Sequence, residues 1–199
     1  MGLFSSKLCS PYDDVAARVL ILGLDSAGKS TLLYRLSNLT ELQFSSGANF
    51  IYHIPSQPTV VYQVETIYPR LSPIPLNLWD LGGQEKVRAL WKYYVTGIEG
   101  LIFVIDSTDH SRIHEVQQEL LRVMDLIDDK TTPIVIAANK QDLEHALDVQ
   151  ELKLALCLPE LKVNVEWPIC PTSAFTGEGV MDAFCLLAQL IHRRRWQQQ

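Results

Sequence analysis

At 199 residues, the chain is long enough for one domain with a sizeable core and too short for two. Its formal net charge of −6 argues against binding nucleic acid through bulk electrostatics, and no apolar run approaches the ~18 residues that span a bilayer. The four cysteines and five histidines are scattered, which predicts reduced thiols and no local zinc motif. We therefore expect a cytoplasmic, monomeric protein that does not bind nucleic acid.

The first residues carry a signal for a lipid anchor. The segment Met1–Ser6 fits the N-myristoylation pattern, in which Gly2 is acylated. One acyl chain binds membranes only marginally, so a second signal is expected, and Cys9 is a candidate for palmitoylation. Pro11 limits any helix here to about two or three turns. We expect residues 1–16 to form a membrane-anchoring segment; the alternative is a frayed, unmodified terminus.

From residue 17 to 196, short apolar and β-branched runs alternate with helix-period segments. This pattern predicts an α/β domain with a mostly parallel six-stranded sheet and helices on both of its faces. The expected strands are Arg18–Gly23, Val60–Tyr68, Leu76–Leu81, Gly100–Asp106, Pro133–Asn139 and Trp167–Cys170. The expected helices are Ser30–Leu36, Lys86–Tyr94, Arg112–Ile127, Val149–Cys157 and Val180–Arg194.

Two connections between these elements are unusual. The second and third strands are separated only by a proline-rich turn from Pro69 to Pro75, which is too short for a crossover. These two strands must therefore form an antiparallel hairpin within the sheet. The stretch Ser37–Gln57 is polar, irregular and long for a connection, as is typical of functional or disordered loops.

A phosphate-binding loop (P-loop) is predicted where the first strand ends. The segment Gly23-Leu-Asp-Ser-Ala-Gly-Lys-Ser30 matches G-x-x-x-x-G-K-[ST], with a strand before it and a helix after it. Backbone amides and the helix N-terminus would direct positive charge to the phosphates. Lys29 would reach the β- and γ-phosphates, and the Ser30 hydroxyl would ligate Mg²⁺. The alternative is a glycine turn that caps a helix by chance. The expected phosphate-binding residues are Gly23, Asp25, Ser26, Ala27, Gly28, Lys29, Ser30 and Thr31.

A guanine site is predicted after two later strands. In the segment Asn139-Lys-Gln-Asp142, the Asp142 carboxylate only accepts hydrogen bonds, so it matches the N1–H and amino donors of guanine and rejects adenine. Asn139 can bind the base edge and the Lys140 stem can cover the purine face. Farther on, Ser173 belongs to the same site, and the backbone N–H of Ala174 could donate to guanine O6. Taken alone, N-K-x-D could also be a polar turn.

The segment Trp79-Asp-Leu-Gly-Gly-Gln84 completes the set of motifs. Asp80 can steady Mg²⁺ directly or through water, Gly83 can bring its N–H to the γ-phosphate, and Gln84 can orient an attacking water. The alternative for Gln84 is a residue at a helix start whose side chain bonds the backbone. No arginine is evident that could neutralise transition-state charge from within the chain, so unassisted hydrolysis is expected to be slow.

The segments GLDSAGKS, VETI, WDLGGQ, GLIFVIDSTD and NKQD are similar to those of ADP-ribosylation-factor-like (Arf/Arl) small GTPases, and the similarity runs from about Arg18 to the final helix. The resemblance implies a P-loop small-GTPase fold over residues 17–196. It implies a molecular switch that alternates between GDP and GTP, hydrolyses GTP slowly with Mg²⁺, and recruits effectors to membranes in trafficking or signalling. An exchange factor, a GTPase-activating protein and effectors are then the expected partners.

The resemblance also assigns residues that the motifs alone do not. It places a second Mg²⁺ ligand at Thr59, which could otherwise be a β-favouring residue at a strand start. It places an aromatic effector patch at Tyr62, Trp79 and Tyr94, which elementary physics alone would assign to the core or to half-buried positions.

Two features depart from the family pattern. Val61 stands where family members usually have glycine, and Ser37–Gln57 is longer than the equivalent loop. Neither feature removes a catalytic group, but together they leave open a non-hydrolysing, nucleotide-dependent scaffold. The intact catalytic set argues against a scaffold: Lys29, Ser30, Thr59, Asp80 and Gln84. A P-loop phosphotransferase acting with ATP is opposed by Asp142 and by the lack of a recognisable acceptor-site lid.

Overall fold

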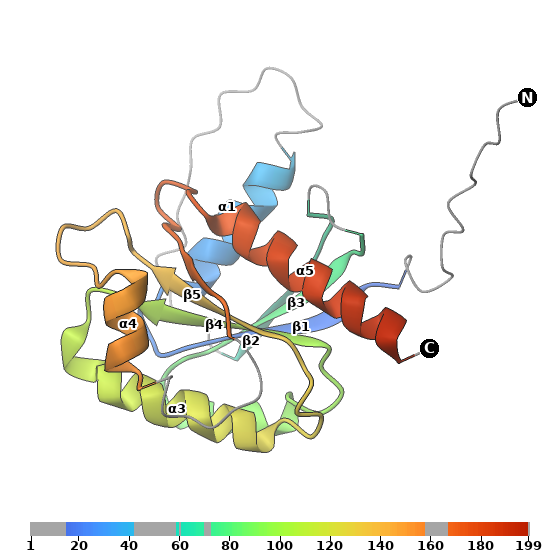
Figure 1. The fold of residues 1–199 in the computed structure, drawn as a ribbon, viewed down its shortest axis with the longest axis horizontal. Coiled ribbons are helices and arrows are strands. Elements are labelled where there is room, and N and C mark those ends of the chain that lie inside the picture. Colours follow the sequence, from blue (N-terminus) through green and yellow to red (C-terminus); the bar gives the residue numbers. More distant parts are fainter. Residues whose placement is uncertain (1–14, 42–58, 60, 70–72, 158–166, 199) are drawn as a thin grey trace, which may run out of the picture.

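The computed structural model describes residues 15–41, 59, 61–69, 73–157 and 167–198. In this part of the chain, six strands form one sheet in the order β2-β3-β1-β4-β5-β6 (Figure 1). Strand β2 pairs antiparallel with β3, and the other pairs are parallel. The expected hairpin within a mostly parallel sheet is therefore confirmed. The strands are β1 (Ala17–Leu22), β2 (Tyr62–Ile67), β3 (Leu76–Leu81), β4 (Gly100–Asp106), β5 (Ile134–Asn139) and β6 (Ile169–Pro171).

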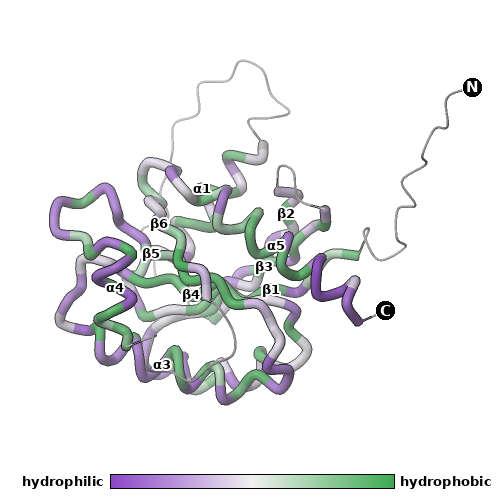
Figure 2. The backbone as a smooth tube through the Cα atoms, in the orientation of Figure 1, coloured by the Kyte–Doolittle hydropathy of each residue, from purple (hydrophilic) through white to green (hydrophobic). Residues whose placement is uncertain are grey.

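Helices cover both faces of the sheet, as the sequence pattern predicts, with α1 and α5 on one face and α3 on the other (Figure 1). Successive side chains of β1 point into alternate layers. Val19 packs in the cluster that contains Phe184 of α5, whereas Leu20 packs in the cluster that contains Leu120 of α3. Figure 2 shows the hydrophobic central strands and the hydrophilic C-terminal end of α5. The helices are α1 (Lys29–Glu41), α2 (Glu85–Arg88), α3 (Ile113–Leu126), α4 (Val149–Ala155) and α5 (Val180–Gln197), with 3₁₀ turns η1 (Trp91–Tyr93) and η2 (His110–Arg112).

Helix α1 continues past the predicted end at Leu36 and is described as far as Glu41. The first part of the stretch Ser37–Gln57, which we expect to be a loop, is therefore helical. The Ser37 hydroxyl and the Asn38 amide donate to carbonyl groups one turn earlier in the helix, at 3.1 and 2.9 Å. These polar residues thus bond to the helix itself rather than breaking it. The rest of that stretch lies outside the described residues.

The predicted helix Lys86–Tyr94 is instead two short pieces, α2 and η1. Tertiary contacts explain the break. Trp91 is fully buried, and its indole N–H donates to the Gly82 carbonyl at 3.0 Å, which turns the chain back toward the end of β3. Arg88 is buried against α3, where acidic side chains bind it. The ends of the other predicted elements differ from the observed ones by up to three residues.

Helix α4 offers a matched pair of leucines for a test of this core. Leu152 is fully buried in the cluster with α3, whereas Leu154 is 71% exposed. Because Leu152→Ala leaves a cavity, we expect it to lower the free energy of unfolding by about 2–5 kcal/mol. Leu154→Ala should change that free energy by less than about 0.5 kcal/mol. Urea unfolding measures both, and equal losses would contradict the packing of α4 described above.

Candidate functional site

The predicted motifs lie at one edge of the sheet. The P-loop follows β1, the segment Asp80–Gln84 begins at the end of β3, and Asn139–Asp142 begins at the end of β5. Ser173 and Ala174 follow β6. Because β1, β3, β4, β5 and β6 are parallel, their carboxyl ends meet at the same edge, where ligands bind in open α/β sheets.

At two positions of the P-loop, the neighbouring atoms leave room only for glycine. Gly23 has a φ of +145°, and a Cβ there would lie 2.1 Å from the carbonyl oxygen of Val104. Gly28 has a φ of +91°, and a Cβ there would lie 2.4 Å from Nδ2 of Asn139. Neither position accepts a side chain without displacing its neighbour. The phosphate loop and the predicted base loop therefore touch at Gly28.

The other P-loop residues form the turn into α1. Ser26 has a φ of +63°, which is the left-handed conformation, and Ala27 is buried. Thr31 lies half-buried in the first turn of α1. A tight turn before a helix directs successive backbone N–H groups into one concavity, which suits an anion.

Lys29 is buried under this loop, with 6% of its surface exposed. Its Nζ donates to the Leu24 carbonyl at 2.8 Å. Burial lowers the pKa of Lys29 to about 8, against the attraction of Asp80 and Asp25, which raises it. An ammonium group that has lost its water at this place would be stabilised by a bound phosphate.

Ser30, Thr59 and Asp80 come together from α1, from the residue range before β2 and from β3. Oγ of Ser30 and Oγ1 of Thr59 are 2.7 Å apart, and both bond to Oδ2 of Asp80, Thr59 at 3.2 Å. Oδ1 of Asp80 is buried and has no hydrogen-bond partner among the described residues. Burial raises the pKa of Asp80 because the charged carboxylate has lost its water. Hydroxyl and carboxylate oxygens suit Mg²⁺. A cation here would stabilise the charged carboxylate and would give its unpartnered oxygen a partner.

Gly83 lies directly against the P-loop. A Cβ on Gly83 would lie 2.4 Å from the carbonyl carbon of Leu24 and 2.5 Å from the nitrogen of Asp25. The N–H of Asp25 donates to the Gly83 carbonyl at 3.1 Å. Gln84 precedes α2 with an exposed side chain that makes no capping hydrogen bond. The alternative that the Gln84 side chain serves as a helix cap is therefore wrong.

The predicted base residues form a connected network. Nδ2 of Asn139 donates to the Ala27 carbonyl at 2.8 Å, and the Ala174 N–H donates to Oδ1 of Asn139 at 2.9 Å. The Ser173 hydroxyl donates to Oδ1 of Asp142 at 2.5 Å. One oxygen of the Asp142 carboxylate is thus held in place by the loop after β6.

Two side chains that the sequence analysis does not single out support the base network. Asp106, at the end of β4, accepts a hydrogen bond from Nζ of Lys140 at 2.5 Å. Burial raises the pKa of Asp106, but hydrogen bonds from Lys140 and Thr108 outweigh it and hold that pKa below its ordinary value. On the other side, Nε of Arg35 in α1 donates to the Ala174 carbonyl at 3.1 Å. Single charged residues outside a motif give no sequence signal for such roles.

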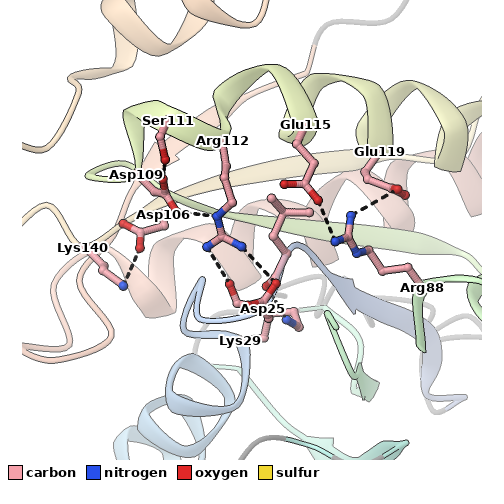
Figure 3. A network of polar contacts seen from close by, with 11 residues as sticks. Asp25, Lys29, Arg88, Asp106, Asp109, Ser111, Arg112, Glu115, Glu119 and Lys140 are labelled. Atoms are coloured by element: carbon pink, nitrogen blue, oxygen red, sulfur yellow. Dashed lines mark hydrogen bonds and ion pairs between the residues drawn. The ribbon is translucent and has the colours of Figure 1, made fainter. Parts of the chain in front are cut away.

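The structure also places an arginine beside the P-loop. Arg112 binds Asp25 and Asp109, and Figure 3 shows it between them. The only sequence signal for Arg112 is its position just after the segment GLIFVIDSTD, which resembles the Arf-like pattern. A second arginine, Arg88, binds Glu115 at 2.7 Å and Glu119 at 3.3 Å.

The three residues of the expected aromatic patch are neighbours in space. The ring centroids of Tyr62 and Trp79 are 5.5 Å apart, and Tyr94 lies 5.8 and 6.2 Å from them. Tyr62 is 51% exposed, whereas Trp79 and Tyr94 are half-buried and pack against the core cluster that contains α3. The patch is therefore open to solvent only in part. The guanidinium carbon of Arg18 lies 5.0 Å from the Trp79 ring centroid on the patch.

The expected lipidation residues, Gly2 and Cys9, lie outside the described residues. Within the described ranges, none of the helices is both long and apolar enough to span a bilayer.

The model of the ADP-ribosylation factor family matches residues 5–191 of the chain. The chain belongs to this family. This Arf-family chain is 35% identical over 177 residues to human ADP-ribosylation factor-like protein 4A, covering 89% of the chain and 84% of the relative. It is 37% identical over 196 residues to mouse ADP-ribosylation factor-like protein 14, covering 98% of the chain and 94% of the relative.

A solved structure supports the same conclusion for the fold. The Arl6 BBS3 small GTPase from Trypanosoma brucei, bound to the nucleotide analogue GppNp, superposes with a TM-score of 0.74 at 28% identity. The match covers 90% of this chain and 99% of that one. The expected small-GTPase fold is thus confirmed, and family membership supports a GTP-binding switch.

The lowered pKa of Lys29 predicts that nucleotide binding takes up a proton in alkaline solution. With a pKa of about 8 in the free protein, Lys29 is mostly neutral at about pH 9, and bound phosphates stabilise its charged form. We expect proton uptake at about pH 9, little at about pH 7, and weaker binding as the pH rises above 8. Calorimetry of nucleotide-free protein in buffers of different ionisation enthalpy measures the uptake. No uptake at the alkaline pH would mean that Lys29 is charged before nucleotide binds.

Proposed function

We propose that this chain is a GTP-binding switch that holds GTP with Mg²⁺, slowly hydrolyses the γ-phosphate, and recruits effectors to a membrane. The observation that supports this most directly is a site with two distinct ends. An acceptor-only carboxylate, Asp142, stands at one end, and the oxygens of Ser30, Thr59 and Asp80 stand at the other. The P-loop connects the two ends.

At the base end, the carboxylate of Asp142 would accept from the N1–H and amino group of guanine. Asp142 is exposed in the protein alone, and adenine offers neither donor there, so a bound adenine would cover the carboxylate without a hydrogen bond to it. Such an asymmetry can reach ~10⁴–10⁵ in selectivity. The hydrogen bond from Ser173 supports this assignment because it orients the carboxylate in advance. The Ala174 N–H already donates to Asn139, so guanine O6 would approach it as a second acceptor.

At the phosphate end, Lys29 and the P-loop amides would hold the β- and γ-phosphates. Ser30 and Thr59 would ligate Mg²⁺, with Asp80 beside them, and the metal would supply positive charge to the phosphates. The unpartnered oxygen of Asp80 supports a cation at this place. Gly83 would bring its N–H to the γ-phosphate from the loop after β3.

The chemistry asked of the protein is positioning and charge neutralisation. Gln84 would orient a water for attack on the γ-phosphorus, while Lys29 would stabilise the oxygens that gain charge. The side chain of Gln84 is exposed and makes no capping hydrogen bond to α2, so it is available for that role. We expect unassisted hydrolysis to be slow, and an activating protein that supplies a cation could accelerate it ~10³–10⁵-fold.

The two segments that contain Thr59 and Gly83 would change conformation with the bound nucleotide, and partners would recognise that change. Thr59 and Gly83 both belong to segments that touch the phosphate end of the site. The partly exposed patch of Tyr62, Trp79 and Tyr94 adjoins these segments, which supports it as the surface for effectors. A non-hydrolysing scaffold would keep the same patch, and a measured hydrolysis rate distinguishes it from the switch.

Gln84→Leu tests the hydrolytic step. The substitution keeps similar bulk but removes both hydrogen bonds to water and phosphate, which matter mainly in the transition state. We expect GTP affinity to stay near that of the wild type, while stimulated hydrolysis falls at least about tenfold, which is about 1.4 kcal/mol of barrier. Single-turnover hydrolysis with and without a cell extract that contains activating proteins measures the effect.

Gln118→Leu is the matched control, because Gln118 is exposed on α3 and its described contact is with His114. It should hydrolyse GTP like the wild type. If Gln84→Leu also hydrolyses GTP at the wild-type rate, Gln84 does not position the water. If the wild type does not hydrolyse GTP at all in either condition, the scaffold is the better description.

Gly2→Ala tests the membrane anchor. The change removes the acylation site, so we expect the protein to move from the membrane fraction to the cytosol while its nucleotide affinity stays the same. Cys9→Ser should produce a smaller shift if a second acyl chain contributes. Fractionation of cells followed by immunoblotting measures both. Unchanged partitioning of Gly2→Ala would refute the lipid anchor and leave the GTPase site unaffected.

A further inference from the structure

Arg112 connects the start of α3 to the P-loop. Its Nε donates to Oδ2 of Asp109 at 2.6 Å, its Nη1 donates to Oδ1 of Asp25 at 3.0 Å, and its Nη2 donates to the Asp25 carbonyl at 3.2 Å. Figure 3 shows the guanidinium group between the two aspartates, with Lys29 beside Asp25. Asp25 is therefore held through its side chain and its backbone by a residue that is distant in the sequence.

The anchor on the α3 side is itself well ordered by polar contacts. The Ser111 hydroxyl donates to Oδ1 of Asp109 at 2.7 Å, while Oδ2 of the same carboxylate accepts from Arg112. The Arg112 side chain is 30% exposed and that of Asp109 is 25% exposed, so water screens this pair only partly. A guanidinium group that is bound at one end keeps its remaining donors aimed at Asp25.

Asp25 stands at the γ-phosphate end of the proposed site. Its N–H donates to the carbonyl of Gly83, and a Cβ on Gly83 would lie 2.5 Å from the Asp25 nitrogen. Gly83 is the residue that we propose to bring its N–H to the γ-phosphate. The backbone of Asp25 therefore lies at the end of the P-loop where we propose the phosphate that distinguishes GTP from GDP, and Figure 3 shows the Asp25 side chain beside Lys29.

A carboxylate at this place opposes the substrate. Like charges repel, and GTP brings more negative charge to this end than GDP does. The Asp25 side chain is 45% exposed, so water screens this repulsion in part. An unpaired Asp25 would thus weaken GTP binding more than GDP binding. Pairing with Arg112 neutralises the carboxylate and holds it toward α3.

We propose that Arg112 is a positioning residue that sets the preference of the site between GTP and GDP by pairing with the Asp25 carboxylate. Its three described side-chain donations are to protein oxygens, so it acts through Asp25 and not by touching the phosphates. This role rests on the proposed nucleotide site and adds a residue from outside the nucleotide-binding motifs.

The test compares the affinities of GppNp, as a slowly hydrolysed stand-in for GTP, and of GDP for the full chain with Mg²⁺. In Arg112→Gln, we expect the affinity for GppNp relative to GDP to fall about threefold to fivefold, as for a partly exposed ion pair. In Asp25→Asn, that ratio should rise or stay the same. In the double variant, Arg112→Gln should no longer change the ratio, because the carboxylate it neutralises is gone. Both affinities are measured on one preparation, so the fraction of active protein cancels.

Arg122→Gln is the matched control on the same helix. The Arg122 side chain binds Glu119 at 3.3 Å and donates to the Arg88 carbonyl at 2.8 Å, away from the P-loop. Its ratio should equal that of the wild type. An equal loss of both nucleotides in Arg112→Gln, or a shift of the ratio that persists without the Asp25 carboxylate, would overturn the role of Arg112 alone. A wild type that binds neither nucleotide would overturn the proposed function and this role together.

Discussion

The amide side chain of Asn139 is the contact on which the rest of the site depends. It is buried, it donates to the Ala27 carbonyl of the P-loop, and it accepts from the N–H of Ala174 after β6. An Asn side chain is one of the few that can donate and accept at the same time, so it joins three loops with one planar group. The contact is possible only because Gly28 has no Cβ, which would lie 2.4 Å from that amide nitrogen. The spacing between the proposed base and phosphate sites is therefore fixed by contacts within the protein.

The phosphate end differs from the base end, because its charged groups have lost water on burial and this loss is unfavourable. Lys29 and Asp80 are both buried, and burial shifts the pKa of each toward its neutral form. Ser30 and Thr59 crowd the same carboxylate and leave its second oxygen without a partner among the described residues. This arrangement supports the proposed binding of phosphates and a cation at this end. A ligand that binds this end only in the folded protein would stabilise the folded domain.

Contacts on one face of the sheet connect this end to α3. Trp91 holds the Gly82 carbonyl from the buried side, and Gly83 lies on the P-loop. Arg88, one turn before Trp91, is bound by two glutamates of α3. Arg112, at the start of that same helix, holds Asp25. Helix α3 and the turn that leads into it are thus in contact with both the P-loop and the segment after β3.

By itself, the sequence determined the order of strands and helices, the hairpin, the P-loop and the base motif. These features depend on local rules: alternation of apolar runs, connection length, and short motifs whose backbone geometry is specific. Only the tertiary structure decided that α1 continues through Ser37 and Asn38, that the helix after Gln84 breaks, and that Arg112 binds Asp25. The break and the Arg112 contact depend on partners that are distant in the chain. The extension of α1 depends on polar side chains that can bond either to their own helix or to solvent. Propensity and periodicity describe only neighbours in the sequence, so they cannot predict which of these partners a side chain will bind; tertiary packing determines it.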